Sequence, residues 1–136
     1  MAKLPDVEES LVGSVPPPIP PKRHGIPRLI AAARYSFAGL RSAFSSEEAF
    51  RLEVLCLIIL TPLALYFGQT PVERVLLIGS ILLLMIIELL NTAVEAVVDR
   101  IGSEYHELSR QAKDIGSAAV FLGMMMVAMV WGLILL

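Results

Sequence analysis

The 136-residue chain has few of the residues that build disulfides, thiolate metal sites or nucleic-acid interfaces. Its one cysteine, Cys56, excludes an internal disulfide and a cysteine-rich metal site. Because Cys56 stands in an apolar run, we expect a buried structural thiol. The formal net charge of −2 gives no overall bias toward nucleic acid. Neither GxxxxGK[ST] nor GxGxxG occurs, so both standard nucleotide-binding loops are missing.

The N-terminal residues lack an apolar signal-peptide core, so we expect no cleaved signal. Six prolines between Pro16 and Pro27 are incompatible with a helix there and favour extended polyproline II. We therefore predict a disordered tail over residues 1–25 and one domain over residues 26–136. A tail of this composition serves either as a plain linker or as a ligand for a proline-recognition domain.

Hydrophobic residues make up 56% of the chain and concentrate in three blocks. The first block is Val54–Phe67, with a start expected near Ala49, and the tight turn GQTP follows it. The second begins near Val72, and the third is Ile115–Leu136. The third block carries no charge and exceeds the roughly 20 residues that cross a hydrocarbon core of about 30 Å. The sequence predicts an all-α membrane protein with three transmembrane helices.

An amphipathic segment precedes the first block. Apolar residues recur at spacings of four, four, three and four, which predicts one apolar face of a helix; they are Leu29, Ala33, Phe37, Leu40 and Phe44. Arg34 and Arg41 share another face. A basic amphipathic helix of this kind lies in the bilayer surface; the alternative is packing against its own helical bundle.

Lys and Arg are distributed unequally between the two sides of the predicted membrane. Six lie from Lys22 to Arg51 and three in the second loop, whereas Arg74 is alone in the first loop. The excess of positive charge predicts a cytoplasmic N-terminus and second loop. The C-terminus then faces outward, with Trp131 near the outer interface.

A polar stripe crosses the end of the second block. On a helix, Asn91, Thr92, Glu95 and Asp99 all fall within about 60° of Glu88. Glu88 lies roughly 9 Å inside the cytoplasmic boundary, at about 1.5 Å per residue. A charged side chain at mid-bilayer costs about 2.5–3.5 kcal/mol, so the stripe indicates function more than a hydrogen-bonded seam between helices.

The stripe has the chemistry of a site for a hard cation. Carboxylate and amide oxygens suit Mg²⁺, which binds through one or two carboxylates plus phosphates. Glu47 and Glu48 precede the first span on the same side. The second loop, which we extend over residues 104–114, adds further charged groups, and Lys113 suits a phosphate. The residues alone predict an acidic site at the cytoplasmic interface and leave open whether it binds a metal ion.

The run ELLNTAVEAVVDRIGSEYHELSRQAKDIGSAAV, Glu88–Val120, closely resembles the prokaryotic membrane-integral diacylglycerol kinases. The pattern E-x-x-N-[ST]-A-x-E-x-V-V-D followed by A-K-D is highly specific, and similarity extends from about Arg28 to the C-terminus. The resemblance implies a homotrimeric bundle in the bacterial inner membrane, with active sites shared between subunits. It also implies transfer of the γ-phosphate of MgATP to a lipid hydroxyl, giving phosphatidic acid from diacylglycerol.

The resemblance also implies roles for single residues. Glu88 matches the general base, and Asn91 matches a polar orienter beside it. Glu95 and Glu47 match the carboxylates that hold Mg²⁺ on ATP, with Glu48 the alternative to Glu47. Both carboxylates also join the nucleotide-binding set, whose other members are Arg28, Tyr35, Asp99, Glu104, Tyr105, His106, Lys113 and Asp114. The lipid-contact positions are Arg28, Arg41, Glu88, Ser117 and Trp131; an aromatic-belt anchor is the alternative for Trp131.

Three other functions stay open at this point. One is phosphorylation of undecaprenol, the substrate of another branch of the same family. A second is a small oligomeric proton or cation transporter, because such proteins use intramembrane carboxylates. The third is a purely structural adaptor. The charged segment 104–114 favours a kinase over a pore, which does not need it.

Overall fold

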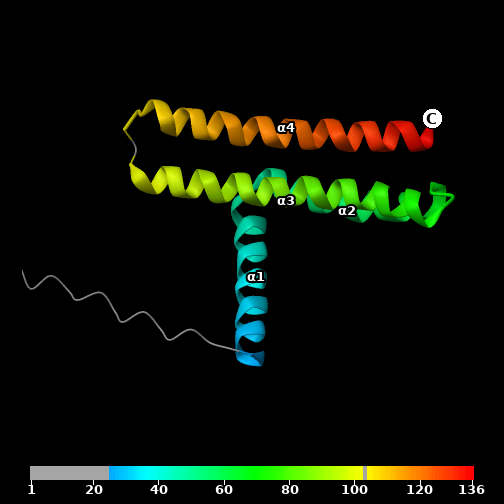
Figure 1. The fold of residues 1–136 in the computed structure, drawn as a ribbon, viewed down its shortest axis with the longest axis horizontal. Helices are drawn as coiled ribbons and strands as arrows, with labels where there is room; N and C mark the ends of the chain where they lie inside the picture. The colour runs from blue at the N-terminus through cyan, green and yellow to red at the C-terminus, as the bar shows by residue number, and fades with distance from the viewer. Residues whose placement is uncertain (1–24, 103) are drawn as a thin grey trace, which may run out of the picture. The chain divides into compact units, whose positions relative to one another are not determined.

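The computed structural model describes residues 25–102 and 104–136, and these form four helices (Figure 1). They are α1 (Ile26–Ser46), α2 (Glu48–Phe67), α3 (Pro71–Ile101) and α4 (Glu107–Leu135). No strand occurs among the described residues, so the all-α prediction is confirmed. The predicted tail, apart from Gly25, lies outside the described residues. Three helices, α2, α3 and α4, are long and apolar enough to cross a membrane, as predicted.

The chain divides after Tyr35 into two compact units. The described part of the first unit is the N-terminal half of α1, where the apolar Leu29 and Ile30 are exposed. The second unit holds the rest of the molecule. α1 confirms the predicted amphipathic helix, and its location at a membrane surface stays a prediction.

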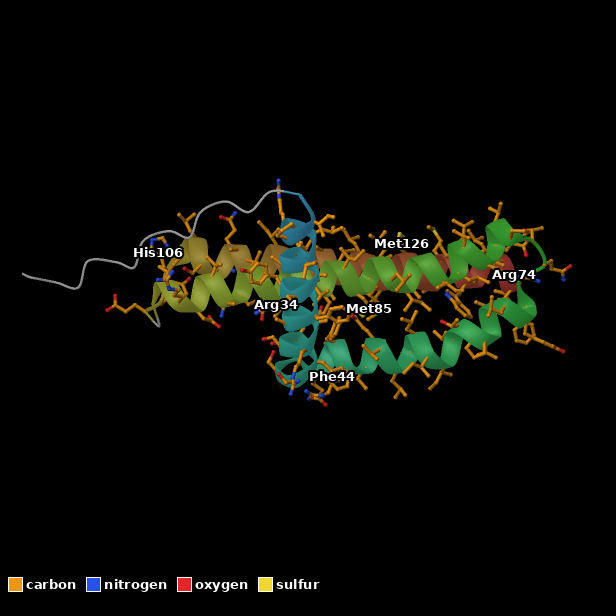
Figure 2. All side chains as sticks on the ribbon, turned by 90° about the horizontal axis from the view of Figure 1, so that it is seen from below. Arg34, Phe44, Arg74, Met85, His106 and Met126 are labelled. Carbon is orange, nitrogen blue, oxygen red and sulfur yellow. The ribbon has the colours of Figure 1, made fainter. Side chains whose placement is uncertain are left out.

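Within the second unit, α3 is the central helix and contacts both α2 and α4. Figure 1 shows α3 and α4 side by side and antiparallel, with the C-terminus at the same end as the α2–α3 turn. In Figure 2, Arg74 and His106 lie at opposite ends of this bundle. The two connections are therefore separated by the full length of α3.

The α2–α3 turn is fixed by a capping box, as the GQTP sequence indicates. The Thr70 hydroxyl accepts a hydrogen bond from the Glu73 N–H at 3.2 Å, and the Glu73 carboxylate accepts from the Gln69 N–H at 2.7 Å. Pro71 begins the helix, where its missing N–H costs nothing. The Arg74 guanidinium donates to the Gly68 carbonyl at 2.9 Å, which closes the turn.

The α3–α4 interface is apolar at the end near this turn. Leu77 and Ile81 are fully buried, and Gly123 of α4 lets the Leu84 side chain approach its backbone. The Trp131 indole donates to the Leu77 carbonyl at 3.1 Å. Most other large apolar side chains are exposed, as expected of helices whose surroundings are lipid or neighbouring chains.

Two sequence predictions need correction. The second loop does not extend to residue 114, because α4 begins at Glu107 rather than Ile115. Between these residues no Pro or Gly breaks the helix, and the His106 ring accepts a hydrogen bond from the Leu108 N–H at 3.2 Å to cap it. Cys56 is exposed on α2, not buried, because α2 presents much of its apolar surface outward.

Replacing Thr70 with alanine is expected to lower the free energy of unfolding by about 1 kcal/mol, because one N-terminal N–H of α3 loses its acceptor. Unfolding in mixed micelles with increasing denaturing detergent measures the change. Thr70→Ser keeps the hydroxyl and should retain most of the stability. Equal stability of the alanine variant and the unaltered protein would show that the cap contributes nothing.

Candidate functional site

The polar stripe predicted on α3 exists, and its innermost residue, Glu88, is buried. Glu88 is only 7% exposed, although it belongs to a helix apolar enough to span a membrane. Its carboxylate interacts electrostatically with those of Glu95, two turns along α3, and Glu47, at the start of α2. Glu88 thus lies within electrostatic range of two other predicted site carboxylates, one on α3 and one at the start of α2.

Glu47 is held at the corner between α1 and α2. Its backbone is extended and caps α2, and its carboxylate accepts a hydrogen bond from the Ser46 hydroxyl at 3.1 Å. The Arg51 guanidinium donates to the Phe44 and Ser45 carbonyls at 3.2 and 3.3 Å. These bonds give hydrogen-bond donors to carbonyls that have no partner within the last turn of α1. Glu48 is exposed in the first turn of α2. This geometry supports Glu47 over Glu48 as the residue nearest the stripe.

Asn91 holds one of the carboxylates of α3, that of Glu95. Its side-chain Nδ2 donates to Glu95 Oε1 at 3.0 Å. Its Oδ1 is buried and has no hydrogen-bond partner among the described residues. The amide thus orients Glu95, whereas the predicted role of Asn91 as a polar orienter beside Glu88 stays a prediction.

At the outer end of the stripe, one salt bridge joins the extended ends of α3 and α4, and two more lie within α4. With 31 residues, α3 is about 46 Å long, longer than the roughly 30 Å of a hydrocarbon core. Lys113 pairs with Asp99 at 2.5 Å, and the two side chains are 44% and 66% exposed. Asp114 pairs with Arg110, which also binds Glu107. Arg110 was not predicted as a site residue; the available signal was an acidic residue three positions before it and another four positions after it.

An open pocket of about 670 Å³ lies at the same end of the bundle. Its lining residues include Ile101, Glu104, Tyr105, His106 and Ser109. The Tyr105 hydroxyl donates to the Glu107 carboxylate at 2.7 Å. The pocket has the volume of a small-molecule site and contains three of the residues predicted to bind the nucleotide.

The other predicted residues divide between the two units of the chain. Arg28 and Tyr35 belong to the unit before the division and are exposed. Arg41 and Ser117 are exposed within the second unit. Trp131 contacts Leu77, eleven residues and about 16 Å along α3 from Glu88. It therefore has an internal packing role, and its lipid contact stays a prediction.

The sequence analysis overlooked Glu53. This residue of α2 interacts electrostatically with Glu88, and its Oε2 is buried without a hydrogen-bond partner among the described residues. The available signal was a lone acid near the start of an apolar span. Burial of its carboxylate disfavours the charged form, and the nearby Glu88 adds to this effect, so Glu53 belongs to the electrostatics of the site.

The donor set fits Mg²⁺ carried by a nucleotide. No group of three or more His, Cys, Asp or Glu able to hold an ion occurs among the described residues. Mg²⁺ bound to phosphates needs only one or two protein carboxylates. Glu47 and Glu95 supply two, both close to Glu88, and both are hydrogen-bonded to neighbours that orient them.

Comparison with known proteins identifies the family. The sequence matches the model of the prokaryotic diacylglycerol kinases over residues 34–135. The chain belongs to this family. It is 54% identical to a diacylglycerol kinase of Haemophilus influenzae, with 84% of the chain and 97% of the relative covered. The Escherichia coli K12 relative of the same name is 50% identical (82% and 91% covered), and that of Pseudomonas aeruginosa is 46% identical (82% and 91%).

Replacing Glu53 with glutamine is expected to raise the free energy of unfolding by roughly 1 kcal/mol, because the variant relieves repulsion with Glu88 and the burial of an unpaired carboxylate oxygen. The thermal unfolding midpoint measures the change. Glu48→Gln, on the same helix but exposed, should leave the midpoint unchanged or slightly lower. A lower midpoint for Glu53→Gln would contradict a repulsive Glu53–Glu88 pair.

Proposed function

We propose that the protein is a membrane-integral kinase that transfers the γ-phosphate of ATP to the hydroxyl of diacylglycerol and forms phosphatidic acid. The observation that carries the proposal is a buried Glu88 among acidic neighbours on an apolar helix, in a chain of the prokaryotic diacylglycerol kinase family. Family membership also disfavours the transporter and the structural adaptor. Undecaprenol remains the competing lipid acceptor.

Glu88 is the general base of the proposed reaction. It lies about one and a half helical turns inside the bilayer, counted from the predicted cytoplasmic boundary. At this depth the hydroxyl of a membrane lipid is within reach. Its carboxylate takes the hydroxyl proton while the lipid oxygen bonds to the γ-phosphorus. The bond from that phosphorus to the β–γ bridging oxygen breaks, and ADP leaves. The pieces that must be aligned are thus a buried base and an incoming phosphate.

The remaining groups position the nucleotide and offset its charge. Glu47 and Glu95 would hold Mg²⁺, and the bound ion would neutralise part of the phosphate charge. Lys113 adds a positive charge at the extended ends of α3 and α4, kept in place by Asp99. The pocket beside His106 accommodates the nucleotide, and Asp114 borders this end of α4.

The proposed setting is the bacterial inner membrane, with the N-terminus and the α3–α4 connection cytoplasmic and the C-terminus outward. The excess of Lys and Arg in the N-terminal segment and around the α3–α4 connection supports this orientation, and Arg74 lies at the opposite end of the bundle from His106 (Figure 2). We further propose a homotrimer with active sites shared between subunits. The exposed apolar faces of α2 and α4 leave room for neighbouring copies.

In mixed micelles containing diacylglycerol and labelled ATP, the protein is expected to form phosphatidic acid only when Mg²⁺ is present. Chelation of the metal with EDTA should stop the reaction, and added Mg²⁺ should restore it. Undecaprenol offered in competition identifies the preferred acceptor. Ion flux in liposomes without phosphorylation of either lipid would contradict the kinase.

Replacing Glu88 with glutamine is expected to lower turnover at least about a hundredfold, because a general base contributes about 10²–10⁴ to the rate. Binding of MgATP and the oligomeric state should be retained. Glu73→Gln, at the opposite end of α3, is the control and should keep the rate. A near-normal rate in Glu88→Gln would remove the base assignment while leaving the kinase activity itself intact.

A further inference from the structure

Gly116 of α4 lies directly against the side chain of Asn91. A Cβ built on Gly116 would overlap Asn91 Oδ1 and would stand 3.2 Å from its Cγ and 3.9 Å from its Cβ. Gly116 is an ordinary helical residue, and Gly25 is the one glycine of the described chain with a positive φ. Glycine is therefore needed at this position because it has no side chain, and not because of its backbone conformation.

The space is occupied by the amide that holds Glu95. Asn91 Nδ2 donates to Glu95 Oε1 at 3.0 Å, and the buried Oδ1 has no conventional partner among the described residues. Because a Cβ would overlap Oδ1, the Cα–H bond of Gly116 points toward this oxygen, which is the arrangement of a weak Cα–H···O contact. The amide is thus held between the α4 backbone and the Glu95 carboxylate.

We propose that Gly116 is a positioning residue: its missing side chain seats the Asn91 amide, which in turn fixes the Glu95 carboxylate where the nucleotide-bound cation is held. The inference rests on the proposed kinase function for its kinetic consequences. Its structural core, a three-residue chain from α4 to Glu95, is independent of the reaction.

Alanine at position 116 perturbs this chain selectively. The overlapping atom is the end of a flexible side chain, so the amide rotates away before the helices separate. Alanine is also a better helix former than glycine, so α4 itself is not weakened. The expected outcome is a folded protein in which Asn91 no longer donates to Glu95.

Gly123→Ala is the matched control. Gly123 lies seven residues further on the same face of α4 and also packs against α3. Its added Cβ would meet only apolar groups, Leu84 Cδ1 at 2.9 Å and Ile87 Cδ1 at 3.2 Å. This variant reports the cost of crowding the interface without touching the polar stripe.

The first measurement needs no turnover. In the side-chain amide NMR spectrum, the Asn91 signal is identified by its loss in Asn91→Ala; it should shift in Gly116→Ala and stay in place in Gly123→Ala. With a non-hydrolysable ATP analogue, Mn²⁺ binding followed by EPR should weaken about 10- to 100-fold in Gly116→Ala, the usual effect of removing a partner that orients a metal ligand. Unchanged Mn²⁺ binding would overturn the inference.

The second measurement is a double-mutant cycle on turnover and on the Mg²⁺ concentration for half-maximal rate. Gly116→Ala should raise that concentration in the unaltered protein and have no further effect in the Asn91→Ala background, where the overlap no longer exists. Equal effects in both backgrounds would show a merely structural role for Gly116. An unaltered protein that phosphorylates no lipid would refute the proposed function instead, and the NMR and EPR results would still decide the positioning role.

Discussion

The structure depends on keeping a carboxylate away from hydrocarbon. A charged group inside a bilayer is stable only when protein surrounds it, and Glu88 is almost fully covered while most large apolar residues of the same chain are exposed. In a soluble protein the charged groups are exposed and the apolar groups are buried. At this end of the bundle a charged residue is buried, and apolar residues are exposed. Helices α2 and α4 flank α3 and limit access to the polar stripe, and this cover also brings the neighbouring acids within range of Glu88.

The α3–α4 interface changes character along its length while its contacts keep nearly the same spacing. Leu77 meets Trp131, Leu84 meets Gly123, Asn91 meets Gly116, and Asp99 meets Lys113. The first three positions on α3 are seven residues apart, as in helices that cross at a small angle. Two glycines allow close approach, one beside an apolar side chain and one beside an amide. The same packing that joins the helices therefore also orients the site.

The site has two parts that differ in their exposure to solvent. The buried part, from Glu88 to Glu95, is formed by side chains that touch through helix packing and by one hydrogen bond. The exposed part, from Asp99 to Asp114, consists of salt bridges between solvent-accessible groups, which contribute little to stability individually. In the proposed reaction, a nucleotide phosphate would compete for Lys113 at small energetic cost, whereas any change at Asn91 must displace packed atoms.

The sequence alone was sufficient for the helices, the turn and the stripe, because hydrophobic blocks, the GQTP capping signal and a 100° period are local properties of the chain. It also identified the family, since the motif from Glu88 to Val120 is specific. It placed the start of α4 too late and expected Cys56 to be buried, because charge marks the end of a membrane core but not the end of a helix, and apolar character does not tell which face is covered. Only the tertiary structure revealed the Glu53–Glu88 proximity and the contact of Gly116 with Asn91. Both join residues on different helices, and the register between packed helices is set by the fit of their side chains, which no single segment contains.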